Sequence, residues 1–281
     1  MNQPHATTTA LPSALVDLCY VRLAVQDPGP AAAFASDVLG LQRVPDKRSA
    51  LFRSDHRYHT LSLVTDTETP SIGVELRDEA TLERIEHELH RHGFEAHRGT
   101  KEDCDRRFVR EVLIAQDASG NTIDLVLRPA QSGRRYFPSR DAGVTGLQGV
   151  GLRSVVPKDD ARFWTLILGA RVSDWAGDIA YLQLDDKHHR VALYPSDRPG
   201  VLYINYDVES LDAIMQSYYF VQERQIKVVH GPGREPASGQ IFLRFEGPEG
   251  LIFSYTHGLS TIGPDHRPRQ FAAEGSSLCE W

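Results

Sequence analysis

Hydrophobic and polar residues alternate along several stretches of the chain, and this is the period of a strand with one buried face. The clearest stretch covers residues 201–208, and a shorter one covers residues 189–194. The segment between them, Pro195 to Gly200, has the proline, serine and glycine content of a turn. The pattern therefore predicts two consecutive strands, with a pair of histidines at the start of the first.

Other segments have the helical period. Within residues 79–92, Leu82, Ile85 and Leu89 form one apolar stripe. Further helices are predicted at 31–38, 158–167 and 209–221. In the first half, strands are predicted at 16–25, 42–45, 49–53, 58–65, 71–77, 94–98, 108–115 and 122–127. In the second half, they are predicted at 147–155, 170–174, 178–184, 189–194, 201–208, 226–229, 241–245 and 251–256.

The two halves of the chain repeat one another. His59 lies 130 positions before His189, and Gly73 lies 130 positions before Tyr203. Further pairs at an offset of 129 or 130 are Phe34 with Phe163, Leu39-Gly40 with Leu168-Gly169, and Gly120 with Gly250. A near-constant offset along most of the chain indicates a tandem duplication.

Each half has the order βαβββ twice, so the predicted fold class is α+β, with four tandem βαβββ modules in two similar halves. We expect each half to be a curled mixed sheet that forms a cup, with helices outside and a concave face open to a ligand. The predicted parts are a loose N-terminus (1–14), a first domain (15–128), a linker (129–143), a second, pocket-bearing domain (144–258) and a tail (259–281). The tail is expected to be either a docked arm or disordered.

Composition narrows the class of partner. The 281 residues are 41% hydrophobic and 25% charged, with a net charge of −7 and no basic stripe, which argues against a nucleic-acid partner. No apolar run is long enough for a membrane helix, and residues 1–13 do not have the pattern of a signal peptide. The odd set of Cys19, Cys104 and Cys279 matches no zinc or redox motif. We therefore expect a cytoplasmic protein whose partner is a small molecule.

Three motifs carry a family resemblance. They are residues 120–124 (Gly-Asn-Thr-Ile-Asp), residues 188–193 (His-His-Arg-Val-Ala-Leu) and residues 231–234 (Gly-Pro-Gly-Arg). With the βαβββ modules, they resemble the vicinal oxygen chelate superfamily, which includes glyoxalases and bleomycin resistance proteins. Within it, residues 15–258 are similar to the two-domain type I extradiol catechol dioxygenases. The resemblance implies that the second half is the active one and that the protein is a homo-oligomer.

In that family, two histidines and a glutamate of the active half bind Fe(II) or Mn(II) and leave open positions for a catechol and oxygen. The resemblance places these three ligands at Gly149, Tyr203 and Ser254. None of these residues is a suitable ligand. The equivalent positions in the first half are Tyr20, Gly73 and Asp124, which supply one carboxylate. We therefore expect no metal triad and no metal cofactor.

Other family positions retain functional side chains. His189 matches a histidine that assists proton transfer, and Glu235 stands where a second histidine follows the Gly-Pro-Gly-Arg turn. Arg244 replaces a substrate-binding tyrosine, Tyr255 matches a family position, and Tyr206 is a candidate for stacking on an aromatic ring. The predicted catalytic residues are His189, Glu235 and Tyr203, and the predicted substrate-binding residues are Arg244, Tyr255 and Tyr206.

Structural roles are the alternatives for these residues. His189 could be a hydrogen-bonded histidine at a strand edge, and Tyr203 could fill the lost metal cavity. Glu235 and Arg244 could form a structural ion pair. His188 is expected at the surface. The histidines His87, His90, His92 and His97 are expected on solvated faces, and Asp55, His56 and His59 to be a degenerate copy of the active motif.

The hypothesis for function is an extradiol-dioxygenase-like enzyme that acts on an aromatic or phenolic molecule by acid-base chemistry without the metal triad. A metal-free protein that binds or sequesters aromatic ligands is the alternative. An Fe(II)-dependent extradiol ring-cleavage dioxygenase is the second alternative.

Overall fold

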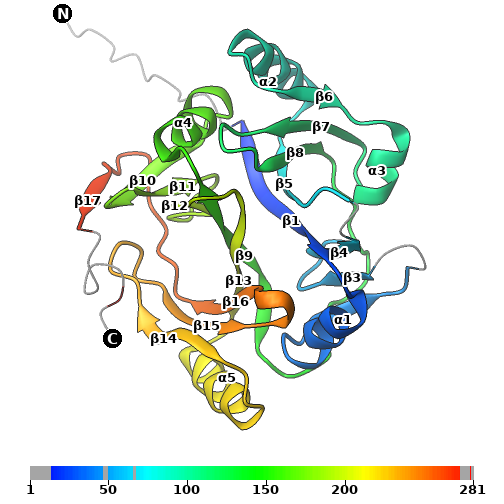
Figure 1. The fold of residues 1–281 in the computed structure, drawn as a ribbon, viewed down its shortest axis with the longest axis vertical. Coiled ribbons are helices and arrows are strands. Elements are labelled where there is room, and N and C mark those ends of the chain that lie inside the picture. Colours follow the sequence, from blue (N-terminus) through cyan, green and yellow to red (C-terminus); the bar gives the residue numbers. More distant parts are fainter. Residues whose placement is uncertain (1–13, 47–49, 66–67, 273–278, 280–281) are drawn as a thin grey trace, which may run out of the picture.

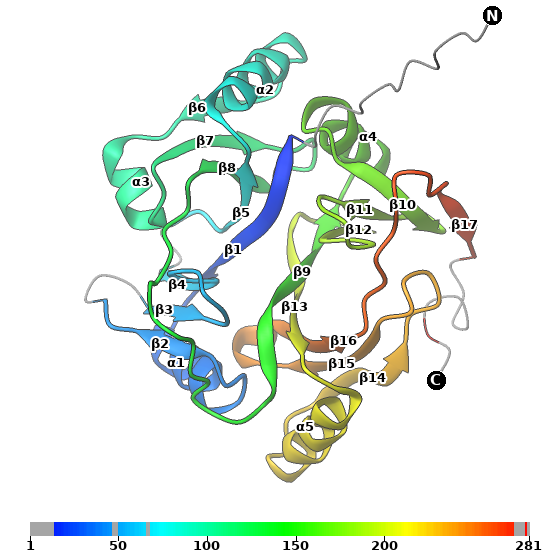
Figure 2. The ribbon, with the colours of Figure 1, turned by 180° about the vertical axis from the view of Figure 1, so that it is seen from behind.

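The computed structural model describes residues 14–46, 50–65, 68–272 and 279. Two curled sheets lie side by side, and the helices lie at the periphery in both views (Figures 1 and 2). The strands of the first half are β1 (Leu15–Val25), β2 (Gln42–Val44), β3 (Ala50–Arg53), β4 (Leu61–Thr65), β5 (Ser71–Leu76), β6 (Ala96–Arg98), β7 (Glu111–Gln116) and β8 (Thr122–Leu127). Its helices are α1 (Pro28–Asp37), α2 (Glu79–Arg91) and α3 (Lys101–Arg107).

The second half repeats this order. Its strands are β9 (Val144–Ser154), β10 (Arg171–Ala176), β11 (Ile179–Gln183), β12 (Val191–Pro195), β13 (Gly200–Val208), β14 (Val228–Arg234), β15 (Ile241–Glu246), β16 (Ile252–His257) and β17 (Arg269–Phe271). Its helices are α4 (Pro157–Arg162), a π-helical turn (Phe163–Ile167), α5 (Leu211–Glu223) and a short 3-10 turn (Pro248–Gly250).

The sheet topology confirms the α+β fold and the duplication. The first sheet has the strand order β2-β3-β4-β1-β5-β8-β7-β6. The second, from its other end, is β10-β11-β12-β9-β13-β16-β15-β14, with β17 added beside β10. Each strand of the first sheet therefore has a counterpart in the second, and the central strands β1 and β9 correspond.

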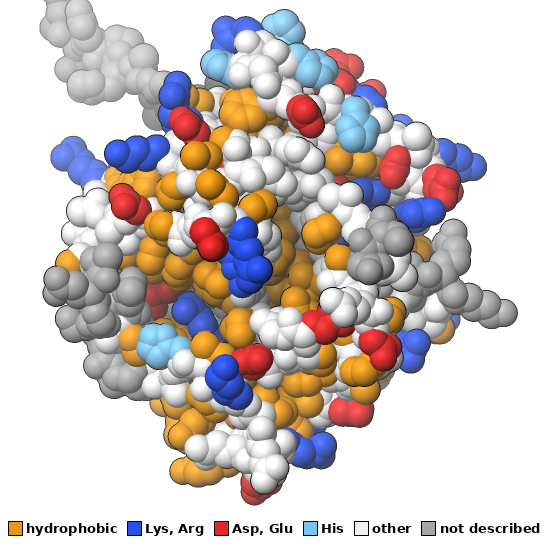
Figure 3. All heavy atoms as spheres, viewed as in Figure 1, with side chains coloured by type: hydrophobic (Ala, Val, Ile, Leu, Met, Phe, Trp, Pro, Cys, Tyr) orange, Lys and Arg blue, Asp and Glu red, His pale blue; other side chains and the backbone are white. Residues whose placement is uncertain are grey.

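Buried apolar residues from both halves form one continuous core. It includes Leu18 and Leu41 from the first half, and Leu147 and Tyr255 from the second. Helix α2 contributes the predicted stripe of Leu82, Ile85 and Leu89, all buried. Figure 3 shows charges of both signs scattered over one face, with hydrophobic side chains around a hollow near its middle.

Several local expectations were wrong. Helix α3 was not predicted, because Lys101–Arg107 has no apolar stripe; a capping box between Thr100 and Asp103 starts it instead. Residues 231–234 lie within strand β14 rather than in a turn. The segment 158–167 divides into α4 and the π-helical turn.

The tail is docked as far as residue 272. Strand β17 pairs in parallel with β10, and an isolated bridge joins Thr261 to Lys187. The remainder of the tail, apart from residue 279, lies outside the described residues, as does almost all of the expected loose N-terminus. Within the described part of the chain, no helix has the length and apolar content needed to cross a membrane.

Candidate functional site

Two adjacent histidines, His188 and His189, come just before strand β12 and are buried in the second half. His189 is 1% exposed and His188 is fully buried, so the expectation of a surface position for His188 was wrong. Both residues lie in the turn between β11 and β12, where strict strand alternation does not apply. The carbonyl oxygen of Ser260, in the docked tail, accepts a hydrogen bond from the backbone N–H of His188. The two imidazoles therefore share one buried environment.

A chain of hydrogen bonds runs from the edge of the sheet to His189. Asp174, in β10, accepts a bond of 2.8 Å from Nε2 of His188. Nδ1 of His188 lies 3.0 Å from Nδ1 of His189. The backbone N–H of Arg269, in the tail strand β17, donates to Asp174 over 2.7 Å, and the Arg269 guanidinium forms an ion pair with the same carboxylate. Three segments that are distant in sequence thus meet at one buried carboxylate.

The protonation of this chain follows from burial and charge. Burial lowers the pKa of His188, and it lowers the pKa of His189 further, so both rings are neutral. Burial alone would raise the pKa of Asp174, but hydrogen bonds from Arg269 and His188 hold it below its usual value. The Asp174 carboxylate therefore accepts a hydrogen bond from Nε2–H of His188, and Nδ1 of His188 accepts one from Nδ1–H of His189.

The other ring nitrogen of His189, Nε2, consequently has no proton and presents a lone pair. Nε2 of His189 is buried and has no hydrogen-bond partner among the residues that the structure describes. A buried unpaired acceptor is costly unless a ligand or water satisfies it. Unpaired polar atoms of this kind in a cup are typical of a binding site.

Glu235 lies beside the histidine pair. Its carboxylate accepts hydrogen bonds from the hydroxyls of Ser238 at 2.6 Å and Tyr181 at 3.3 Å, and it lies 4.0 Å from Nδ1 of His189. Burial raises the pKa of Glu235, against the Ser238 hydrogen bond and the charge of Arg244. Two of the predicted catalytic residues, His189 and Glu235, are therefore neighbours.

Arg244 does not pair with Glu235. Its guanidinium carbon lies 4.2 Å from the centre of the Tyr203 ring, and no ion pair joins it to Glu235 within the described residues. The hydroxyl of Tyr203 bonds to that of Tyr194 at 3.3 Å. Tyr203 is buried, whereas Tyr194 and Arg244 are half-buried and mark the side of the cluster that reaches solvent. Nε of Arg244 is buried without a partner.

The register of the central strands changes the expected row of lost ligand positions. Asn205, not Tyr203, lies opposite Gly149 on β9 and beside Ser254 on β16. Tyr203 lies opposite Gly151 instead, and a Cβ atom there would be 2.5 Å from its ring. The first half has the same row, with Tyr20 opposite Gly73 and Gly73 beside Asp124. The residue of β13 that is equivalent to Gly73 of β5 is therefore Asn205 and not Tyr203, two positions later than an offset of 130 predicts.

This row does not fit a divalent iron or manganese ion. A Cβ atom on Gly149 would lie 2.8 Å from the carbonyl oxygen of Arg190, so a histidine at that position would collide with backbone. The amide of Asn205 donates to Gln148, whose own amide donates to the carbonyl of His189. Within the described residues, no three His, Cys, Asp or Glu side chains are grouped to hold a metal. We derive no chemical step through a metal here.

Two predicted substrate-binding residues lie on the opposite face. Tyr206 pairs with Tyr255 across β13 and β16, one residue out of phase with Asn205 and Ser254. The hydroxyl of Tyr255 donates to the carbonyl of Val38 at 2.8 Å, and both rings belong to the core. The strand alternation excludes these two tyrosines from the cup that contains His189.

The histidines of the first half divide as expected. Those on and after α2 are exposed, namely His87, His90, His92 and His97. His56 is exposed as well, whereas His59 is buried against the Tyr20 ring at 4.9 Å and Asp55 forms an ion pair with Arg57. Sequence reasoning missed Asp174, Arg269, Tyr181, Gln148 and Asn205. A carboxylate at a predicted strand end was a weak signal for Asp174, and no local signal identified Arg269.

Comparisons with known proteins identify the fold and the relatives. No protein-family model matches the chain. It superimposes on a halotolerant catechol dioxygenase with a TM-score of 0.86 at 19% identity, over 95% of this chain and 93% of that one. It also matches an Mn(II)-bound glyoxalase from Novosphingobium aromaticivorans, with a TM-score of 0.84 at 23% identity, over 96% of this chain and 91% of that one. The chain therefore has the two-domain vicinal oxygen chelate fold that its residues indicated.

The relatives by sequence are dioxygenases. An iron-dependent extradiol dioxygenase of Rhodococcus jostii (strain RHA1) is 27% identical over 70% of this chain and 74% of its own length. A biphenyl-2,3-diol 1,2-dioxygenase of Pseudomonas sp. (strain KKS102) is 29% identical over 63% and 66%. A 1,2-dihydroxynaphthalene dioxygenase of Sphingobium xenophagum is 24% identical over 88% and 89%. The resemblance to extradiol dioxygenases is confirmed at this level.

Proposed function

We propose that the second half of this chain binds a small phenolic molecule and transfers a proton from its hydroxyl to Nε2 of His189, without the family's metal triad. The observation that carries the proposal is the buried, unpartnered Nε2 of His189, whose lone pair is fixed by the chain through His188 to Asp174. The names of the relatives, which act on biphenyl and naphthalene diols, support an aromatic ligand.

The proton transfer uses groups that are already in place. The phenolic O–H donates to Nε2 of His189; as the proton moves, the O–H bond breaks, an N–H bond forms, and the ligand becomes a phenolate. The imidazolium keeps its Nδ1–H toward His188, with Glu235 at 4.0 Å to stabilise its charge. Arg244, which approaches the same cluster over the face of Tyr203, supplies positive charge for the phenolate.

Glu235 is the second acid-base group in the proposal. Because burial raises its pKa, a carboxyl in this position exchanges protons closer to neutral pH than an exposed one does. Its hydrogen bonds from Ser238 and Tyr181 hold it in one orientation beside His189. A phenolate made by His189 is a carbon nucleophile. The Glu235 carboxylate, 4.0 Å from Nδ1, can take a proton from the imidazolium and donate it to a ring carbon, so that the phenolic O–H bond is replaced by a C–H bond in an isomerisation.

Metal-dependent ring cleavage is the second candidate, and the names of the relatives favour it. The donor set argues against it, because Gly149, Asn205 and Ser254 provide one amide and one hydroxyl. Binding without turnover is the third candidate. It needs the same phenol contact at His189 and no return of the proton to carbon.

One experiment separates the three. The protein is loaded anaerobically with Fe(II) or Mn(II), desalted, assayed for bound metal, and then given 2,3-dihydroxybiphenyl with oxygen; a metal-free sample receives the same phenol in a parallel titration. The proposal expects no retained metal, and a phenolate absorption that appears on binding and is lost in His189→Ala. Retained metal with ring cleavage would replace it by the dioxygenase function. Phenolate formation with no new product after long incubation would reduce it to binding.

A further inference from the structure

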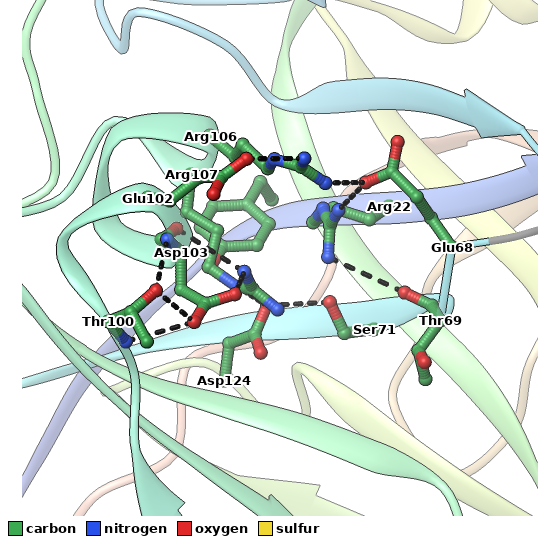
Figure 4. Close-up of polar contacts among 11 residues, drawn as sticks. Arg22, Glu68, Thr69, Ser71, Thr100, Glu102, Asp103, Arg106, Arg107 and Asp124 are labelled. Carbon is green, nitrogen blue, oxygen red and sulfur yellow. Dashed lines mark hydrogen bonds and ion pairs between the residues drawn. The ribbon is translucent and has the colours of Figure 1, made fainter.

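The first half has a cavity of its own, on the concave side of its sheet. It has a volume of about 350 Å³ and lies between β1, β7 and helix α3. Charged side chains of both signs line it: Arg22 projects from β1 and Arg106 and Arg107 project from α3, and the carboxylates are those of Glu68, Glu95 and Asp103 (Figure 4). Nothing in the proposed phenol site uses this cavity, because His189 and Glu235 belong to the second half.

The deepest layer of the cavity contains more positive than negative charge. Arg22 is 3% exposed and Arg107 is 5% exposed, and the carboxylate at their depth is Asp124, which is fully buried. Oδ2 of Asp124 accepts from Arg107 Nε at 2.9 Å, and also from the hydroxyls of Tyr20 and Ser71. Oδ2 therefore serves three donors, none of them Arg22, whereas Oδ1 is buried with no hydrogen-bond partner among the described residues.

The partner of Arg22 is held nearer to solvent. Its terminal nitrogen pairs with Glu68 at 2.9 Å, and the Glu68 side chain is 30% exposed and is shared with Arg106 at 3.4 Å. Nε of Arg22 is buried with no partner. Burial and the neighbouring charge of Arg107 lower the pKa of Arg22, which is the sign of a cation with incomplete compensation. A buried guanidinium in this state favours an additional anion.

The two cups differ at corresponding positions of their central strands. Arg22 on β1 lies opposite Ser71, and Gly151 on β9 lies opposite Tyr203. In the second half, the Tyr203 ring lies over Gly151 and is buried. In the first half, these positions are occupied by Arg22 and Ser71, and the buried aromatic ring is that of Tyr20, which lies over Gly73. The first cup therefore has a buried guanidinium where the second has a glycine covered by a tyrosine ring.

We propose that this cavity binds a small organic carboxylate, which pairs with Arg22 and Arg107 and displaces Glu68 from Arg22. Planar carboxylates match the fork of a guanidinium, and two buried guanidiniums strengthen the pairing. The volume exceeds that of an inorganic anion, and Ile114, Gln116 and Thr122 provide apolar and hydrogen-bonding walls for the rest of the molecule. An aromatic acid of the size of benzoate fits this description.

The test uses benzoate and its neutral isostere benzamide with the full chain, by isothermal titration and by saturation-transfer NMR at low salt. We expect benzoate to bind in the millimolar range or tighter and benzamide at least tenfold more weakly. Arg22→Gln should weaken benzoate binding at least tenfold. Glu68→Gln should strengthen it severalfold, because the competing carboxylate is gone. Glu102→Gln is the matched control, since Glu102 pairs with Arg106 at the rim and is exposed.

Four results would each overturn the proposal. They are an absence of benzoate binding at 20 mM ligand, equal affinity for benzamide, an unchanged affinity in Glu68→Gln, and a loss of binding in His189→Ala, which would place the acid in the second half. If Arg22→Gln does not fold, the Glu68→Gln result decides, because that substitution leaves the buried arginines in place. Failure of the phenol site leaves each of these outcomes unaffected.

Discussion

Nδ1 of His188 and Nδ1 of His189 lie 3.0 Å apart, and one of the two nitrogens has to donate to the other. Because Asp174 accepts a hydrogen bond from Nε2–H of His188, Nδ1 of neutral His188 has no proton and the donor is His189. A neighbouring residue that touches no ligand thus sets which nitrogen of His189 is free. This relationship leads to the first prediction.

Asp174→Asn should change the tautomer of His189. The neutral amide removes the charge that holds the Nε2 proton of His188, so the order of donors and acceptors along the chain is no longer enforced. We expect ¹⁵N NMR to show His189 protonated at Nδ1 in the wild type and a mixture of tautomers in Asp174→Asn. Asp186→Asn, at an exposed carboxylate in the neighbouring turn, is the control. An unchanged ¹⁵N pattern in Asp174→Asn would remove the role assigned to Asp174.

His59 should make the protein less stable in acid. Burial lowers its pKa to about 3, from the ordinary value of 6.5. Between these values the unfolded state binds a proton that the folded state does not, so the stability contributed by neutral His59 is present above pH 6.5 and is lost as pH falls toward 3. The loss is about 1.4 kcal/mol per pH unit within this window. His188 and His189 shift in the same direction.

Urea unfolding at several pH values checks this expectation. His59→Gln should flatten the pH dependence of the unfolding free energy between pH 6 and pH 4, relative to the wild type. The matched control His97→Gln alters an exposed histidine and should leave the slope unchanged. Equal slopes in all three proteins would mean that His59 is protonated in the folded state.

Gly149→Ala should destabilise the fold, because the new Cβ atom would approach the carbonyl oxygen of Arg190 to 2.8 Å. Overpacking against backbone costs about 1–3 kcal/mol. Gly263→Ala, where nothing lies within 4 Å of the added atom, is the control and should change stability by less than about 0.5 kcal/mol. Chemical denaturation measures both. A neutral Gly149→Ala would show that β9 tolerates side chains at this position, and would reopen the question of a histidine ligand there.

Tyr255→Phe should lower stability, whereas Tyr203→Phe should change phenol affinity. Tyr255 donates to the carbonyl of Val38 and accepts from Arg140, whose Nε also donates to Val38. Loss of the hydroxyl removes two hydrogen bonds and should cost about 1 kcal/mol of stability without altering phenol binding. Tyr203 bonds to the half-buried Tyr194 within the cup that contains His189. Its substitution should alter phenol affinity more than the unfolding midpoint. A reversed outcome would exchange the faces to which the two tyrosines are assigned.

Local pattern and duplication were sufficient for the architecture. The alternation in residues 201–208 and the stripe of α2 depend on the burial of one face, which each segment's own residues determine. The offset between the halves indicated the duplication, and the family resemblance singled out His189. Helix α3 was not predicted, because it begins with a capping box and charged side chains and has no apolar stripe.

The site depended on registers and contacts that a linear reading does not contain. Strand pairing placed Asn205, not Tyr203, between Gly149 and Ser254, because two residues are inserted into the offset at β13. The same alternation moved Tyr206 and Tyr255 to the core. The burial of His188, its bond to Asp174 and the approach of Arg269 join residues from three separate segments. The sequence by itself determined the duplicated cup, because this follows from residue type and period. Only the tertiary structure decided which histidine nitrogen is free and which cup contains the buried arginines, because both depend on long-range packing.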